Sequence, residues 1–236
     1  MVLEVIATSA ADVHIAAENG ADRIELISGI MEGGVTPSKG LIAQAVKASN
    51  IPVQVMIRPH ANHFCYDKDD VAVMKEDIAT AKALGAAGIV LGALTEEGKV
   101  DEAVLEELLE EAGELSVTFH RAFDEIDHQM EALEILRKYP QIDRVLTSGG
   151  AASVLDAEER IKQMVQWSEK GSLSILAGSG LTLDTLEACI DQTGVKEVHL
   201  GRSVRKNGHQ LETLDPQKVR AAAEIVRRCE QRASFF

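Results

Sequence analysis

Short apolar runs recur at regular intervals along the chain, and each is rich in Val, Ile and Leu. Runs of about four to eight such residues favour strands that are buried on both faces. We therefore predict eight strands, at residues 3–7, 23–27, 52–57, 88–92, 115–119, 144–148, 173–178 and 197–201.

The segments between these runs carry helix signals. Asp67 precedes a long amphipathic segment that Gly85 closes, and Thr182 precedes another with Gly194 beyond it. Residues 36–38, Thr-Pro-Ser, offer a cap followed by a proline at the first helical position. Besides the helix that begins there, helices are predicted at 10–19, 67–84, 100–113, 127–138, 157–168, 183–191 and 216–232.

Strands that alternate with helices pair in parallel, because each helix returns the chain to the same end of the sheet. An open doubly wound sheet is one solution, but no Gly-x-Gly-x-x-Gly follows the first strand, which disfavours dinucleotide binding. A closed barrel, which typically has about 250 residues, fits the 236-residue chain. No linker or composition shift interrupts the sequence. We predict an α/β fold, a (β/α)8 TIM barrel forming a single domain over residues 1–236.

Active sites of such barrels lie at the C-terminal ends of the strands, and side chains alternate between the two faces of each strand. Val117 and Phe119 suit the helix side, which turns His120 into the barrel mouth. Each inward polar group could be a satisfied core residue, but isolated charges in an apolar barrel cost on the order of several kcal/mol. Their convergence predicts a functional cavity. The alternation turns six such residues inward: Glu4, Glu25, Arg58, His120, Ser148 and His199.

Two more ionisable residues follow His120. We expect Arg121 to turn toward a loop or a neighbouring carboxylate, and Asp124 to cap or brace the following helix.

Glycine-rich loops follow the seventh and eighth predicted strands. Many TIM barrels bind phosphate there, because glycines expose backbone N–H groups and a helix N-terminus favours an anion. The alternative is that these glycines only form tight turns. The candidate anion-binding residues are Gly178, Ser179, Gly180, Gly201, Arg202 and Ser203.

The net charge of −14 disfavours partners that are themselves anionic, both nucleic acids and membrane surfaces. The N-terminus lacks a signal-peptide pattern, and no apolar run approaches the ~18 residues that a membrane span needs. Three cysteines, far apart and odd in number, imply no disulfide framework. We expect a cytoplasmic protein.

Several longer motifs stand out along the chain: GADRIEL (20–26), EGGVTPS (32–38), MIRP (56–59), GALTEEG (92–98), VTFHRAFD (117–124) and RVLTSGG (144–150). Together they resemble those of the CutC family, whose members are described as copper homeostasis proteins. The resemblance implies a TIM barrel, a cytoplasmic location, a homodimer and a role in copper homeostasis with Cu(I) binding. Glu25, Arg58, His120, Arg121 and Asp124 fall on the family pattern.

The chain departs from the family pattern at a position where Cu(I) binding would need a cysteine. Cu(I) prefers thiolate and thioether ligands, yet Ile27 stands where many members have a cysteine. The usual Arg-Pro-Arg-Gly-Gly-Asp-Phe segment is changed at residues 58–64, which creates His60-x-x-His63-x-Cys65. These three residues are candidate metal ligands, and the alternative is an exposed loop with incidental histidines. The other two cysteines lie in helical patterns and are expected to be structural.

Two function classes remain open. The protein either binds copper or another metal, as the family name implies, or is an enzyme acting on a small phosphorylated or carboxylated molecule. In the second case His120 is a candidate acid or base with Glu25 and Glu4 as partners, and Arg58 could hold an anionic group bidentately. A glutamate together with His120 could also hold a divalent cation. No lysine falls at an inward strand end, which disfavours a Schiff-base enzyme. A non-catalytic scaffold would not explain the inward polar groups.

Overall fold

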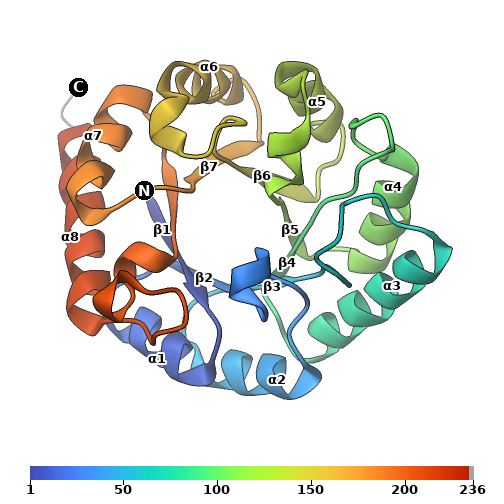
Figure 1. Ribbon diagram of the computed structural model, residues 1–236, viewed down its shortest axis with the longest axis horizontal. Coiled ribbons are helices and arrows are strands. Elements are labelled where there is room, and N and C mark those ends of the chain that lie inside the picture. Colours follow the sequence, from blue (N-terminus) through green and yellow to red (C-terminus); the bar gives the residue numbers. More distant parts are fainter. Residues whose placement is uncertain (234–236) are drawn as a thin grey trace.

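The structure is a computed structural model that describes residues 1–233. Within that range eight parallel strands pair in chain order, and the eighth pairs with the first to close a barrel (Figure 1). The predicted TIM barrel is therefore confirmed. The strands are β1 (Val2–Ala7), β2 (Arg23–Leu26), β3 (Val53–Met56), β4 (Gly88–Leu91), β5 (Ser116–Phe119), β6 (Ile142–Thr147), β7 (Ser174–Gly178) and β8 (Glu197–Leu200).

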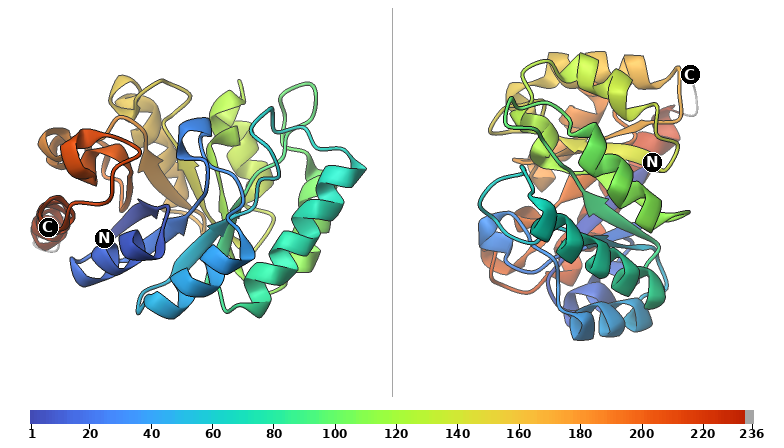
Figure 2. Two further views of the ribbon diagram at one scale, coloured as in Figure 1. Left: turned by 60° about the horizontal axis from the view of Figure 1, so that its bottom comes forward. Right: turned by 90° about the vertical axis from the view of Figure 1, so that its right-hand side faces the viewer.

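Helices surround the barrel as an outer ring, and short 3₁₀ turns occupy several of the loops that follow the strands (Figures 1 and 2). None of the helices within residues 1–233 is long and apolar enough to cross a membrane. The helices are α1 (Ala10–Glu18), α2 (Lys39–Ala48), α3 (Lys68–Ala83), α4 (Glu102–Ala112), α5 (Gln129–Leu136), α6 (Glu158–Ser168), α7 (Leu183–Thr193) and α8 (Pro216–Ala233). The 3₁₀ turns are η1 (Ile30–Glu32), η2 (Arg121–Glu125), η3 (Val154–Asp156), η4 (Arg202–Val204) and η5 (Lys206–Gly208).

The helix boundaries follow from capping. Asp67 starts α3 with a capping box, and Gly194 ends α7 in the left-handed conformation, both as the sequence predicts. The start of α2 was predicted wrongly. Ser38 is its N-cap, with its hydroxyl accepting from the backbone N–H of Leu41 at 3.2 Å, so Pro37 lies before the cap and not in the first turn.

Alternation along the strands separates an apolar helix-facing layer from a polar interior. Val5, Ile24, Val55 and Val117 are buried against the helices in one continuous core. The residues between them point into the barrel, where aliphatic side chains normally fill the space. In this chain much of that interior is charged, and the interior opens into a cavity at the C-terminal ends of the strands.

Candidate functional site

A cavity of about 760 Å³ lies at the C-terminal ends of the strands, where the sequence places the site. Four of the six predicted inward residues line it: Glu25, Arg58, His120 and His199. Apolar side chains complete the floor, and they come from Ile6, Ile27, Met56 and Leu146. The cavity is therefore mixed in character, as small-molecule sites usually are.

The other two predicted residues lie outside the cavity lining. Glu4 is completely buried. It lies beside His199, because the two residues are register partners on the neighbouring strands β1 and β8. Ser148 does not line the cavity. Its hydroxyl lies 2.9 Å from the carboxylate of Asp124 and 2.6 Å from the backbone oxygen of Ala151, either of which can accept its one proton, so Ser148 belongs to a set of contacts that braces the loop after β6.

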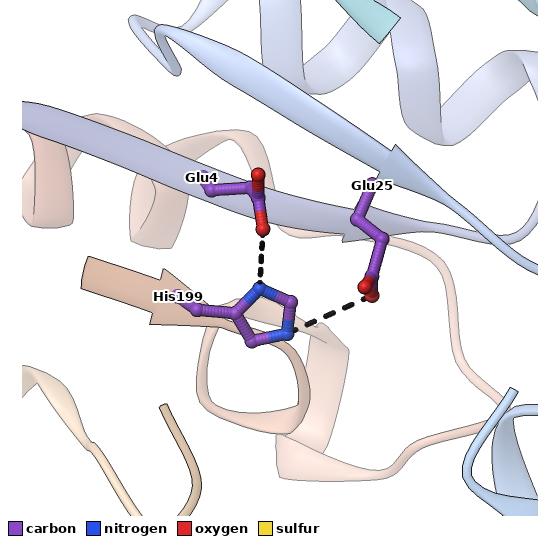
Figure 3. A group of neighbouring side chains, drawn as sticks. All are labelled: Glu4, Glu25 and His199. Atoms are coloured by element: carbon purple, nitrogen blue, oxygen red, sulfur yellow. Dashed lines mark hydrogen bonds and ion pairs between the residues drawn. The ribbon is translucent and has the colours of Figure 1, made fainter. Parts of the chain in front are cut away.

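Three buried side chains, Glu4, His199 and Glu25, form a row (Figure 3). Two of them, His199 and Glu25, line the cavity. Oε1 of Glu4 lies 2.7 Å from Nδ1 of His199, and Nε2 of His199 lies 3.7 Å from Oε2 of Glu25. Oε1 of Glu25 is buried and has no hydrogen-bond partner among the described residues. We call Glu4, His199 and Glu25 the buried row.

The charges of the buried row are set by its neighbours. Burial opposes the charge of Glu4 most strongly, but Arg23 and His199 outweigh it and lower the pKa of Glu4 to about 2. Burial raises the pKa of Glu25 to about 7, and the attraction of His199 only partly offsets it. Burial also works against charge on His199, yet Glu25 and Glu4 together raise its pKa. Glu4 is thus ionised, His199 favours the cation, and Glu25 is poised to gain or lose a proton near neutral pH.

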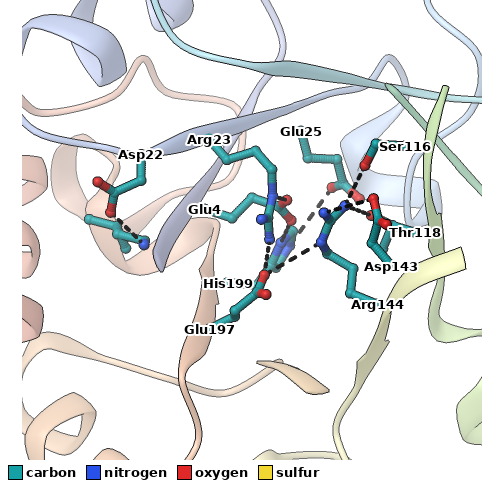
Figure 4. Close-up of polar contacts among 11 residues, drawn as sticks. Glu4, Asp22, Arg23, Glu25, Ser116, Thr118, Asp143, Arg144, Glu197 and His199 are labelled. Atoms are coloured by element: carbon teal, nitrogen blue, oxygen red, sulfur yellow. Dashed lines mark hydrogen bonds and ion pairs between the residues drawn. The ribbon is translucent and has the colours of Figure 1, made fainter. Parts of the chain in front are cut away.

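A second set of charges lies deeper in the barrel and supports Glu4 (Figure 4). Arg23 pairs with Glu4 through Nε and with Glu197 through Nη2 at 2.6 Å. Arg144 lies 3.5 Å from the same Glu197 carboxylate and donates to Thr118 at 3.0 Å. Sequence reasoning did not single out Arg23, Arg144 or Glu197. The signal was present for all three. Arg23 and Glu197 stand two positions before Glu25 and His199, and Arg144 stands four positions before Ser148, so each shares the face of a predicted inward residue.

A second part of the cavity wall is built around Arg58, which follows β3, the neighbour of β2. Its Nη1 donates to the backbone oxygens of Glu32 and Gly34, each at 3.1 Å, and its Nη2 donates to Ala61 at 3.3 Å. The guanidinium carbon lies 4.6 Å from the ring centroid of Phe64. These contacts fix the guanidinium, while Nε is buried and has no partner among residues 1–233.

His120 lies on the same wall, at the end of β5. Its Nδ1 accepts from the backbone N–H of Ala122 at 3.2 Å, because His120 is the N-cap of η2. Nε2 is buried without a partner in the described part of the chain. Burial lowers the pKa of His120 to about 3, and the positive charge of Arg58 adds to that effect. His120 is therefore a neutral imidazole with its proton on Nε2.

The glycine-rich loops after β7 and β8 form another part of the wall. Ser179, Gly180, Gly201, Arg202 and Ser203 line the cavity, as the anion-site hypothesis requires. Gly178 does not line it, and a Cβ there would come within 2.8 Å of Leu146 and 3.2 Å of His199.

This wall combines an exposed cation with a strained turn. Ser179 has a φ of 78°, which is uncommon for a residue other than glycine. The hydroxyl of Ser203 is buried without a partner among residues 1–233, and the side chain of Arg202 is exposed. Lys218 of α8 also lines the cavity and donates to the backbone oxygen of Arg205 at 2.9 Å. Sequence reasoning missed Lys218, because it comes from a helix and not from a strand end.

Arg121 and Asp124 pair at the rim, as expected for Arg121. Nε of Arg121 donates to Asp124 at 2.7 Å, and Nη2 donates to Ser148 at 3.1 Å. Asp124 also accepts from the backbone N–H groups of Ser148 and Gly150, so it braces the loop after β6 and not the following helix. The brace holds the partly exposed Arg121 guanidinium beside the cavity.

Comparison of the sequence with protein-family models and with curated proteins shows which family this chain belongs to. The family model described as "CutC family" matches residues 1–204. The chain belongs to the CutC family. A CutC family protein of Photobacterium profundum is 40% identical over 210 residues, covering 89% of this chain and 85% of that protein. A human protein named copper homeostasis protein cutC homolog is 42% identical over 207 residues, covering 87% and 75% of the two chains.

Solved structures agree with this assignment. A crystal structure of CutC from Streptococcus agalactiae aligns with a TM-score of 0.80 and 30% identity, covering 84% of this chain and 97% of that one. N-(5'-phosphoribosyl)anthranilate isomerase from Pyrococcus furiosus aligns with a TM-score of 0.64 at 15% identity, covering 97% and 99% of the two chains. At that identity the second likeness shows the barrel fold alone.

The predicted metal ligands of this CutC protein lie on the loop after β3. Nε2 of His60 lies 3.1 Å from the carboxylate of Asp70, and the rings of His60 and His63 are 4.8 Å apart. Cys65 is partly buried against the apolar core. Among residues 1–233 these three side chains do not form a cluster of converging ligand atoms.

Within residues 1–233 the one cluster that meets that criterion is the buried row, whose ligand atoms lie within 4.8 Å of one another. Its atoms already bind each other and Arg23, so Glu4 and Nδ1 of His199 are occupied. Its oxygen and nitrogen donors are also unlike the sulfur ligands that Cu(I) prefers. Ile27 stands where the family resemblance implies a cysteine, and Met56 supplies the single sulfur in the cavity lining.

Proposed function

We propose that this CutC protein is an enzyme that binds a small anionic molecule in the barrel mouth and transfers a proton to or from it. One observation carries the proposal. Three side chains that line the cavity, each less than a tenth exposed, carry a buried polar atom that has no partner among residues 1–233: Oε1 of Glu25, Nε of Arg58 and Nε2 of His120. Buried polar groups are nearly always paired, and an unpaired one costs roughly 1–3 kcal/mol. A bound ligand would pair all three.

The charge around the mouth supports an anionic ligand. The chain as a whole carries −14, yet Arg58, Arg121, Arg202 and Lys218 all line this cavity. Cations gathered at one concave site of an acidic protein steer and hold anions. Asp184 also lines the cavity, at the start of α7, so the positive potential is greatest away from that helix.

Thermal denaturation with anionic probes tests the binding half of this proposal. Inorganic phosphate, glycerol 3-phosphate and citrate are the probes. We expect at least one to raise the melting temperature, because a ligand at 100 times its Kd adds about 2.7 kcal/mol to the free energy of unfolding. The expected increase is lost in Arg202→Gln, whose side chain is exposed at the mouth. It is kept in Arg227→Gln, which removes the same charge from an exposed position on α8 outside the cavity lining.

Equal stabilisation of both variants would place anion binding outside the mouth. No stabilisation by any probe would remove the anionic ligand from the proposal.

A second candidate function is copper handling, which the names of the curated relatives favour. On this view copper is cargo held by His60, His63 and Cys65 on the loop after β3. The fit is incomplete, since Cys189 and Cys229 are buried in α7 and α8. Oxygen and nitrogen donors of the buried row suit Cu(II) better than Cu(I).

Anaerobic Cu(I) titration against a competing chelator tests this candidate. Copper handling at the loop predicts tight stoichiometric binding that Cys65→Ser and His63→Ala abolish and Cys229→Ser keeps. Weak binding that is the same in all three variants would reject the loop as a copper site.

We further propose that the protein works in the cytoplasm, a location that its three free cysteines support. A homodimer stays a prediction, which sedimentation equilibrium would check.

A further inference from the structure

We propose that the cavity catalyses proton transfer at a carbon atom next to a carbonyl group, with Glu25 as the base and neutral His120 as a hydrogen-bond donor to the carbonyl oxygen. The substrate class is therefore a small anion that carries a ketone or aldehyde beside an enolisable C–H bond. This inference rests on the proposed function and specifies its chemistry. Three features of the cavity carry it.

The first feature is the tautomer of His120. Its Nδ1 accepts a hydrogen bond from the backbone N–H of Ala122, so Nδ1 bears the lone pair and Nε2 bears the proton. That Nε2–H has no acceptor among the described residues, although the ring lines the cavity. A neutral imidazole that is fixed in this way can donate to a carbonyl oxygen as negative charge develops there. The same arrangement of a carboxylate base and a neutral histidine serves enolisation in triosephosphate isomerase.

The second feature is the position of Arg58 beside His120. The positive charge of Arg58 acts on His120, and Phe64 lies against both, 4.6 Å from the guanidinium carbon and 4.8 Å from the imidazole ring. Nη1 and Nη2 of Arg58 are held by backbone oxygens, which leaves Nε as the unpaired donor. Two donors on one wall form a site for an oxyanion.

The third feature is Glu25 on β2, the strand that pairs with β3. Its Oε1 is buried and unpaired, and burial keeps its pKa near 7, which suits a base that must both take and return a proton. The charged groups that act on Glu25 are His199, Glu4 and Arg23. We assign His199 a positioning role, because Nδ1 is committed to Glu4 and Nε2 faces Glu25.

The proton and the electrons balance without another reactant. The C–H bond breaks, its proton forms an O–H bond with Glu25, and its electron pair becomes the carbon–carbon double bond of an enolate. The carbonyl π electrons move to oxygen, where His120 and Arg58 donate hydrogen bonds. Return of the proton to the same or the neighbouring carbon restores a carbonyl compound and the Glu25 carboxylate.

Deuterium exchange tests this step with two matched probes. Dihydroxyacetone phosphate is a phosphorylated hydroxyketone with an enolisable C–H bond, and glycerol 3-phosphate has similar size and charge but no carbonyl. In D₂O we expect the full-length protein to bind both and to exchange carbon-bound protons of the ketone alone, as followed by ¹H NMR. Glu25→Gln and His120→Gln should each slow exchange by at least about 100-fold and still bind glycerol 3-phosphate. The Glu25→Gln protein, purified identically, also measures any contaminating isomerase.

The outcomes separate this inference from the proposed function. Binding of glycerol 3-phosphate without exchange of the ketone overturns the inference and leaves the proposed function standing. Exchange that persists in Glu25→Gln or His120→Gln also overturns it. Failure of both probes to bind removes the proposed function, and the inference with it.

Nitrogen NMR provides a readout that needs no ligand. In protein labelled with [¹⁵N]histidine, with His120→Gln used for assignment, we expect His120 to stay neutral with Nε2 protonated from pH 5 to 8. Titration of His120 within that range, or a proton on Nδ1, overturns the inference even if an anion binds.

Discussion

The buried carboxyl of Glu25 makes a quantitative prediction about stability and pH. Glu25→Gln keeps the shape of the side chain and removes its charge. Burial raises the pKa of Glu25 from 4.5 to about 7 in the folded protein. The neutral form is therefore favoured by folding, and this contribution is complete below pH 4.5 and lost as the pH rises through 7. At about 1.4 kcal/mol per pH unit, the loss is roughly 3 kcal/mol.

The glutamine variant lacks this loss. We expect its free energy of unfolding to rise relative to wild type by roughly 3 kcal/mol between pH 4.5 and 8.5. For a chain of this size that corresponds to about 6–12 °C in melting temperature. Circular dichroism melts at several pH values measure the difference directly. Glu110→Gln, an exposed position on α4, is the matched control and should show no trend.

Parallel curves for wild type and Glu25→Gln across this range would refute the reasoning. They would mean that Glu25 has the same pKa in the folded and unfolded chain, and that water or a rearranged His199 compensates its burial. The opposite slope would mean that the carboxylate is the favoured form in the folded protein.

Three further predictions concern the scaffold around the site. Asp12→Ala should destabilise the protein by about 3–5 kcal/mol in chemical denaturation, because it removes the carboxylate that pairs with the fully buried Arg205. Glu110→Ala, at an exposed position, is the control and should cost well under about 1 kcal/mol. Gly88→Ala should yield little folded protein by circular dichroism, since a Cβ on β4 would overlap the backbone oxygen of Ser116; near-normal stability would show that the barrel can expand there. Cys65 should react with a thiol reagent in the native protein while the other two cysteines react only after unfolding, and simultaneous reaction of all three would contradict the burial of α7 and α8.

The fold could be predicted because its signal is local. Each strand is an apolar run, and helices α1 to α4 each begin at a capping side chain, so the alternation of strands and helices shows in the sequence without any long-range information. The start of α2 shows the limit of that reasoning. Thr36 and Ser38 are both suitable caps, and the hydrogen bond from Leu41 that selects Ser38 is a property of the folded backbone.

The site could be predicted as far as strand parity, the alternation of side chains between the two faces of a strand, determines which residues point into the barrel. Parity places Glu25, His120 and His199 at the mouth, where the structure has them. It fails for Ser148, whose short side chain bonds to Asp124 and Ala151 in the loop after β6 and does not line the cavity. It cannot find Lys218, which approaches from α8 through the tertiary fold.

The charged interior of the barrel argues for function more strongly than any single residue does. Replacing a buried ion pair with aliphatic residues is often neutral or stabilising, so stability alone does not explain charges on β1, β2, β6 and β8. Most of these charges are paired with each other, and among them Oε1 of Glu25 at the cavity and Nε of Arg144 deeper in the barrel have no hydrogen-bond partner among residues 1–233. A network that served stability alone would provide every buried polar atom with a hydrogen-bond partner. This network pairs Glu4 with His199 but leaves Oε1 of Glu25 without a partner among residues 1–233. The lower charges therefore serve to hold Glu4 ionised and His199 in its cationic form beside Glu25, and the cavity is where that arrangement has a consequence.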